Sequence, residues 1–133
     1  MSNWEDLNIE AHVRAILSEV EYYNREHPFG RPFLTAYQIA IEYQRQYSRE
    51  ASQLGLQVGG EGIGERNSLA QYLAAQLSKR IQSGELHGIE GAFISNNNLV
   101  RISFENGDEE VISSLTNTEF DLSMFRLNSN INQ

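Results

Sequence analysis

The stretch from Gly59 to Leu115 constrains the fold of this chain more than any other part of the sequence. It begins with a glycine-rich loop, continues as an amphipathic helical pattern and ends in short runs of alternating polarity. Glycine inside a helix costs about 1 kcal/mol relative to alanine, so this loop interrupts helical structure. Two helical patterns precede the loop. The expected order is therefore helix, helix, loop, helix and strands.

The first two helical patterns differ in the width of their apolar faces. One helix is predicted from about Asp6 to Arg25, because its apolar residues share a single stripe at helical spacing. These residues are Ile9, Val13, Ile16, Leu17, Val20 and Tyr23. We expect it to end at His27-Pro28, since the residue before a proline disfavours the α conformation. A second helix is predicted from about Thr35 to Gln53, and its broad apolar arc favours a central position in the core.

A third helix is predicted from Ser68 to Ser83, after the glycine-rich loop. Asn67 is expected to be its N-cap, and Gly84 is typical of the position just beyond a helix C-terminus. Its buried face is expected to hold Leu69, Ala70, Leu73, Ala74, Leu77 and Ile81.

Beyond His87 the apolar period changes to two, which predicts strands over 89–95, 99–104 and 109–115. Turns are expected at Asn96-Asn97-Asn98 and at Asn106-Gly107, and the second of these favours a type I′ hairpin. The apolar residues after the third strand are expected to dock as a short element; they are Phe120, Leu122, Met124, Phe125 and Leu127.

Length and composition indicate one domain with a real hydrophobic core. The chain has 133 residues, of which 40% are hydrophobic, and it contains no cysteine. We expect a single domain over 1–127 and a disordered tail over 128–133. The first residues lack the apolar segment of a secretory signal, and no apolar run is long enough for a membrane span. A cytoplasmic protein without a membrane partner is therefore expected.

The net charge of −8 is unevenly distributed along the chain. Residues 1–65 and 102–133 each carry a net charge of −5, whereas 66–101 carries +2. The only basic window thus covers the third helix and the first predicted strands. An acidic protein repels polyanions at long range, so this window alone is a weak footprint for nucleic acid.

The loop from Gly60 to Gly64 suggests a phosphate site, because helix N-termini offer free N–H groups to anions and Arg66 would add a positive charge. The dinucleotide-binding motif requires a preceding strand, however, and a helix is predicted there. Glu61 and Glu65 would also repel a phosphate. A loop that is mobile, or that a partner orders, is the alternative interpretation.

No catalytic or metal-binding motif stands out in the sequence. The three histidines lie far apart and lack the short paired spacing of zinc ligands. The acidic residues around the predicted hairpin turn lack the spacing of a calcium loop; they are Glu105, Asp108, Glu109 and Glu110. We therefore expect no cofactor and no metal, and the sequence does not support an enzymatic activity.

Three helices followed by a β-hairpin resemble the winged-helix branch of the helix-turn-helix proteins. In this resemblance, 35–53 is the second helix, 68–83 the recognition helix and 89–104 the wing. It implies an α+β fold in which a three-helix core is followed by a small antiparallel β-meander. It also implies that the recognition helix enters the major groove of DNA. The side chains that would contact bases or phosphates are Arg66, Ser68, Gln71, Tyr72, Lys79 and Arg101.

Two functions remain open at this point. The first is a small nucleic-acid-binding regulator, expected to be a homodimer because two weak half-sites then add. The second is an acidic module that binds or inhibits a basic protein partner. The surface around Gln71, Lys79 and Arg101 discriminates between them. A positive stripe there favours DNA, and an acidic or apolar patch favours a protein.

Overall fold

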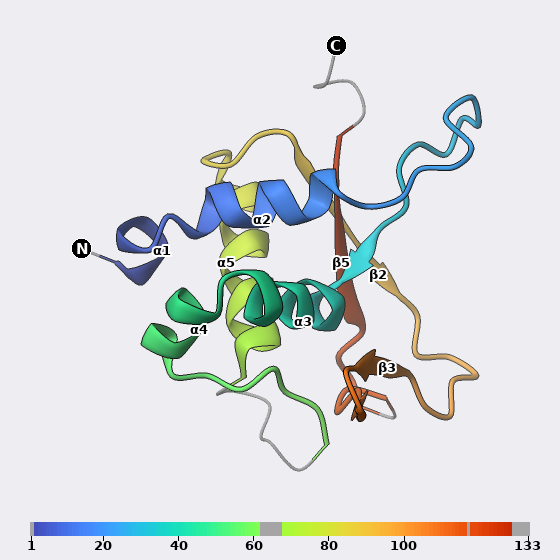
Figure 1. Ribbon diagram of the computed structural model, residues 1–133. Helices are drawn as coiled ribbons and strands as arrows, with labels where there is room; N and C mark the ends of the chain where they lie inside the picture. Colours follow the sequence, from blue (N-terminus) through green and yellow to red (C-terminus); the bar gives the residue numbers. More distant parts are fainter. Residues whose placement is uncertain (1, 62–67, 117, 129–133) are drawn as a thin grey trace.

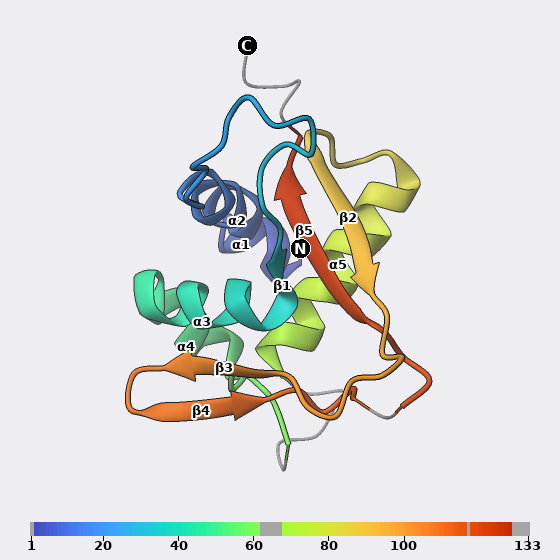
Figure 2. The same ribbon diagram turned by 90° about the vertical axis from the view of Figure 1, so that its right-hand side faces the viewer.

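The computed structural model describes residues 2–61, 68–116 and 118–128 and shows a mixed α+β fold, which confirms the predicted class. Its helices are α1 (Asn3–Asp6), α2 (Ile9–Ser18), α3 (Ala36–Gln46), α4 (Ser48–Leu54) and α5 (Leu69–Ser83). Its strands are β1 (Leu34–Thr35), β2 (Ile89–Ile94), β3 (Ser103–Asn106), β4 (Glu109–Ile112) and β5 (Leu122–Leu127). The helices lie against one side of a sheet, and the β3–β4 hairpin lies across its end (Figure 1, Figure 2).

The N-terminal helix is shorter than predicted and is divided in two. Asn8 has a φ of 55°, so α1 and α2 are separated by a residue in the left-handed conformation. The predicted end at Arg25 is wrong, since α2 ends at Ser18. The residues that follow include β-branched and aromatic side chains, which favour helix less. Tyr23, which was predicted to belong to the buried stripe, is exposed.

The second predicted helix forms with a break near its middle. Its start is confirmed, because the Thr35 hydroxyl accepts from the Gln38 backbone N–H and the Gln38 side chain accepts from the Thr35 N–H. Tyr47 leaves the helical conformation and separates α3 from α4. Gly55 then ends α4 with a φ of 70°, which glycine adopts at little cost.

The third predicted helix is confirmed as α5. Leu69, Ala70, Leu73 and Leu77 are buried as predicted, whereas Ala74 and Ile81 are only partly buried. The N-cap is Ser68 rather than Asn67, which lies outside the described residues. Gly84 follows the helix in the left-handed conformation, as predicted.

The strands do not form the expected meander. β5, predicted only as a short docked element, is the central strand of a three-stranded antiparallel sheet with the order β1-β5-β2. Phe125 of β5 lies opposite Leu34 on one side and Gly91 on the other. β3 and β4 form a separate two-stranded sheet. The buried positions of β5 do not alternate regularly, so its sequence lacks the usual strand period.

The turn predicted at Asn96-Asn97-Asn98 forms, whereas the hairpin turn lies one residue later than predicted, at Gly107-Asp108. Asn98 has a φ of 66°, and the Leu99 N–H donates to the Asn96 carbonyl oxygen. In the β3–β4 hairpin, Gly107 has a φ of 63° whereas Asp108 has no positive φ, which excludes the predicted type I′ geometry. The strand predicted over 99–104 begins only at Ser103.

Leu73→Asp is expected to unfold the protein. The carboxylate would be buried without a partner in place of a fully buried leucine, at a cost of about 4 kcal/mol or more. Ala75→Asp is the matched control, because Ala75 is exposed on the same helix and the change should cost less than about 1 kcal/mol. Thermal melting checks both variants, and equal melting temperatures would contradict the packing of α5.

Candidate functional site

A groove of about 330 Å³ lies along one side of α5. The helix contributes small side chains to it. The ends of β2 and β5, together with Ser114, Leu115, Phe120 and Asp121, form other walls. Because alanine and serine dominate the helical wall, the groove is open along α5 instead of being filled by long side chains. The helical residues that line it are Ser68, Ala70, Gln71, Ala74, Ala75 and Ser78.

Two phenylalanines give the groove its apolar character. Phe93 at the end of β2 is 68% exposed, and Phe120 in the segment before β5 is 61% exposed. Leu122 is buried at the base, and Asp121 places a carboxylate on the rim. Large exposed apolar groups that gather at a concave site mark binding surfaces more often than isolated ones do.

The wall that contains Ser114, Leu115 and Phe120 is held in place by side-chain hydrogen bonds. The Tyr37 hydroxyl accepts from the Ser114 backbone N–H at 3.0 Å, and its ring stacks on Phe104. The Asn96 side-chain amide donates to the carbonyl oxygens of Leu115 and Phe120, each at 2.9 Å. These bonds fix the backbone beside Phe120, so the groove is formed before any ligand arrives.

The structure places the sequence-predicted residues at different parts of α5. Ser68 is only 5% exposed, and its hydroxyl accepts from the Gln71 backbone N–H at 3.0 Å. Its role is therefore to cap the helix, and it offers no surface to a nucleic acid. Gln71 is exposed and lines the groove. Tyr72 is half-buried outside the groove lining, and burial raises the pKa of its hydroxyl.

The remaining predicted contacts are cations. Lys79 and Arg101 are exposed, and neither forms an ion pair within the part of the chain that the structure describes. Arg66 lies outside the described residues. Of the five predicted residues that the structure describes, only Ser68 and Gln71 line the groove.

The N-terminus of α5 already has hydrogen-bond partners. The N–H groups of Leu69 and Ala70 donate to the backbone carbonyl oxygens of Gln57 and Val58, at 2.6 and 3.0 Å. The next N–H is bound by the Ser68 hydroxyl. The first three N–H groups are thus unavailable to an anion, which removes the basis of the predicted phosphate site.

Gly60, in the glycine-rich loop before α5, allows close packing against β4. A Cβ atom on Gly60 would lie 2.9 Å from the Ile112 carbonyl oxygen, which is too close, and the φ of Gly60 is 113°. The same oxygen accepts from the Glu61 N–H at 2.9 Å, which joins the loop to β4. Glycine at this position is explained by close backbone contact. Gly62 to Gly64 lie outside the described residues.

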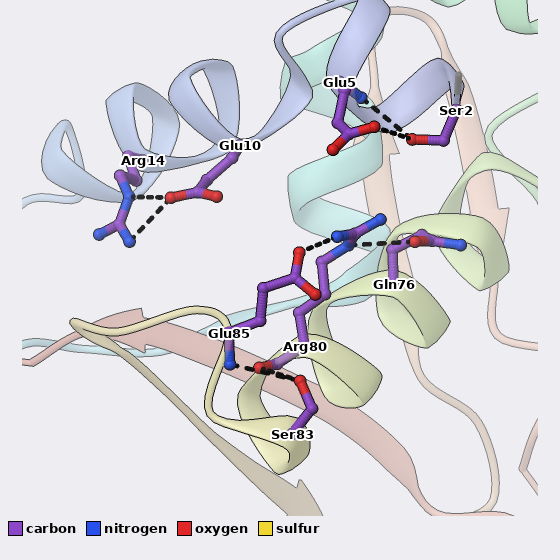
Figure 3. A network of polar contacts seen from close by, with 8 residues as sticks. All are labelled: Ser2, Glu5, Glu10, Arg14, Gln76, Arg80, Ser83 and Glu85. Atoms are coloured by element: carbon purple, nitrogen blue, oxygen red, sulfur yellow. Dashed lines mark hydrogen bonds and ion pairs between the residues drawn. The ribbon is translucent and has the colours of Figure 1, made fainter.

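Most of the described arginines have internal partners. Five form ion pairs, and these are Arg14, Arg45, Arg49, Arg80 and Arg126. Arg80, which belongs to the basic window, binds Glu85 and Gln76 (Figure 3). Its guanidinium group also lies over the Trp4 ring. Its charge is therefore directed toward the protein, and the basic window has fewer free cations than its composition indicates.

The carboxylates of the β3–β4 hairpin, in contrast to these arginines, form no ion pairs with the residues that the structure describes. The four carboxylates, Glu105, Asp108, Glu109 and Glu110, are exposed, and none pairs with a described cation. Glu105 lies directly opposite Glu110 across the two strands, an arrangement that is destabilising for like charges. Among the described residues, no three potential ligands gather into a metal site. The hairpin is therefore a concentrated negative surface.

His12 is the one histidine with partners in the core. Its ring stacks on Tyr47 at 3.9 Å between centroids, and its Nδ1 atom lies 3.0 Å from the Tyr43 hydroxyl. Burial raises the pKa of the Tyr43 hydroxyl, which keeps it protonated and able to donate to the imidazole. This cluster joins α2 to α3 and is structural.

Comparison of the chain with protein-family models, with curated proteins and with solved structures found no match. No helix in the described ranges is long and apolar enough to cross a bilayer. The function of the chain is therefore inferred from the groove beside α5 and from the charged residues around this groove.

Sequence reasoning missed Phe93, Phe120 and Asp121 as site residues. A phenylalanine in an apolar pattern is usually buried, and the sequence carries no signal that separates an exposed one from a core one. The small residues on the exposed face of α5 were the one available indication, since alanine there leaves room for a ligand.

Ser68→Ala is expected to destabilise the protein by about 1–2 kcal/mol, because the N-cap hydrogen bond is lost at a buried position. Ser78→Ala, an exposed change on the same helix, is the control and should have almost no effect. Urea unfolding followed by circular dichroism measures both. Equal stabilities would show that Ser68 does not cap α5.

Proposed function

We propose that this chain is a non-enzymatic protein-binding module that holds an apolar segment of a basic protein partner in the groove beside α5. The observation that supports this most is the exposure of Phe93 and Phe120 at a groove that is already formed. Water contact with both rings is unfavourable, and a partner side chain placed between them would remove it.

The surrounding charge supports a basic partner. Residues 95–121 contain six acidic residues and a single basic one, Arg101. All six are exposed, and one of them, Asp121, stands on the rim of the groove. A field of this sign accelerates association with a cationic partner and disfavours an anionic one.

A nucleic-acid-binding regulator is the second candidate, and one observation favours it. Helix α5 is followed by the antiparallel pair β2–β5, and Gln71 and Lys79 are exposed on it, as in the winged-helix arrangement that the sequence resembles. The wing of such a domain would be the segment 95–121. Its carboxylates would face the phosphates, so we rank this candidate below protein binding.

Selection of random peptides on the immobilised chain tests the proposed function. We expect the selected peptides to combine an aromatic or leucine anchor with lysine or arginine. In a fluorescence-anisotropy titration of one selected peptide, Phe120→Ala should weaken binding about 10-fold or more, since an anchor contact is lost. Val100→Ala is the matched control, because Val100 is 87% exposed and does not line the groove.

Two outcomes would contradict the protein-binding proposal. One is a selection that enriches no basic apolar peptide. The other is a selected peptide that binds the Phe120→Ala variant as tightly as the parent chain.

Titration of mixed-sequence duplex DNA at low and moderate salt separates the two candidates. Protein binding as the main function predicts no measurable affinity even at low salt. Salt-sensitive binding that is lost in Lys79→Glu combined with Arg101→Glu would instead support the regulator, because these exposed cations form no ion pair with any other residue that the structure describes. The melting temperature of the double variant should equal that of the parent.

A further inference from the structure

The outer edge of β2 has free backbone hydrogen-bonding groups. The Asn128 N–H donates to the Gly88 carbonyl oxygen, which sets the phase of the β2–β5 pairing. In an antiparallel ladder, alternate residues of each strand bond to the partner, so Glu90, Ala92 and Ile94 bond to β5. Gly91 and Phe93 point their N–H and C=O groups away from the sheet. These groups have no partner in the part of the chain that the structure describes.

This edge lacks the usual protection against strand pairing. Proteins commonly guard such edges with lysine, proline or inward-pointing charges. Residues 91–95 contain none of these, and they include the exposed side chains of Phe93 and Ile94. The only charge on β2, Glu90, is bound by Arg126 of the neighbouring strand. The edge is therefore apolar and locally neutral.

We propose that β2 pairs with β2 of a second copy of this chain, antiparallel about a two-fold axis at Ala92. The two three-stranded sheets then form one continuous sheet of six strands. This interface goes beyond the proposed peptide groove and requires no partner protein. Ile89 is only 4% exposed and would lie opposite Ser95, so the hydrogen-bonded pairing is confined to Gly91 and Phe93 of the two copies.

In this register the side chains of β2 in one copy fit those of β2 in the other copy. Phe93 of each copy lies opposite Gly91 of the other, so that the ring covers a residue with no side chain, a pairing that stabilises edge glycines. Glu90 lies opposite Ile94 and not opposite another carboxylate. Ala92, on the axis, is small enough for the close approach of a pair without hydrogen bonds. A second copy therefore satisfies both the free backbone groups and the exposed ring.

Net charge acts against this association. Each copy carries −8, and two such chains repel each other over the distance at which charges are unscreened. Because the paired edge itself is neutral, added salt reduces the repulsion without weakening the interface. The dimer should therefore become tighter as sodium chloride is raised, in contrast to an interface held by ion pairs.

Sedimentation equilibrium of the chain alone tests the proposal. We expect the mass to rise from the monomer value of 15.1 kDa toward twice that value with increasing concentration, and to do so more readily at higher salt. Phe93→Pro should hold the mass at the monomer value, because it removes an outward N–H while leaving the bonds to β5 intact. Phe120→Ala changes the groove and not the edge, so it should leave the dimer unchanged.

Amide hydrogen exchange supplies a test that needs no variant. Glu90 and Ala92 should be protected at all concentrations, whereas Gly91 and Phe93 should gain protection only where the dimer forms. A monomer at every concentration and salt would overturn the proposal. So would a dimer in which the amides of Gly91 and Phe93 stay unprotected. Phe93 belongs to both the groove and the edge, but Phe120 lies outside the paired edge, so the groove is tested separately through Phe120.

Discussion

The pairing of β5 with strands from both halves of the chain is the constraint on which the rest of the structure depends. Phe125 is buried between Leu34 of β1, just before α3, and Gly91 of β2, the strand that follows α5. A Cβ atom on Gly91 would lie 3.2 Å from the Phe125 ring, so glycine makes room for it. This pairing positions the two helices and brings Leu122 and Ser123 to the base of the groove.

The helices could be predicted from the sequence because their signals are local. The caps of α3 and α5 and the leucine spacing of α5 lie within a few residues of one another. The central strand could not be placed, since its partners are about 35 and 90 residues away and its buried positions do not alternate. Likewise, nothing local distinguishes the buried Ser68 from an exposed one, or the exposed Phe93 and Phe120 from core residues.

The apolar groove and the charges around it both favour a basic peptide with an apolar anchor as the ligand. Most of the described arginines form ion pairs within the chain. The carboxylates of the β3–β4 hairpin and of the groove rim are exposed. These exposed carboxylates disfavour an anionic partner such as DNA. A peptide with an apolar anchor flanked by lysine or arginine matches both the apolar groove and the exposed carboxylates.

Nuclear magnetic resonance mapping of a bound peptide tests the central claim most directly. In a titration of the labelled chain with a peptide that carries one tryptophan among lysines, the account predicts amide shifts concentrated at Ala74, Ala75, Phe120 and Ser123. Resonances of the acidic hairpin should move less and should respond to salt. Shifts confined to the far side of α5, or no shifts at saturating peptide, would contradict the assignment of the groove as the binding site.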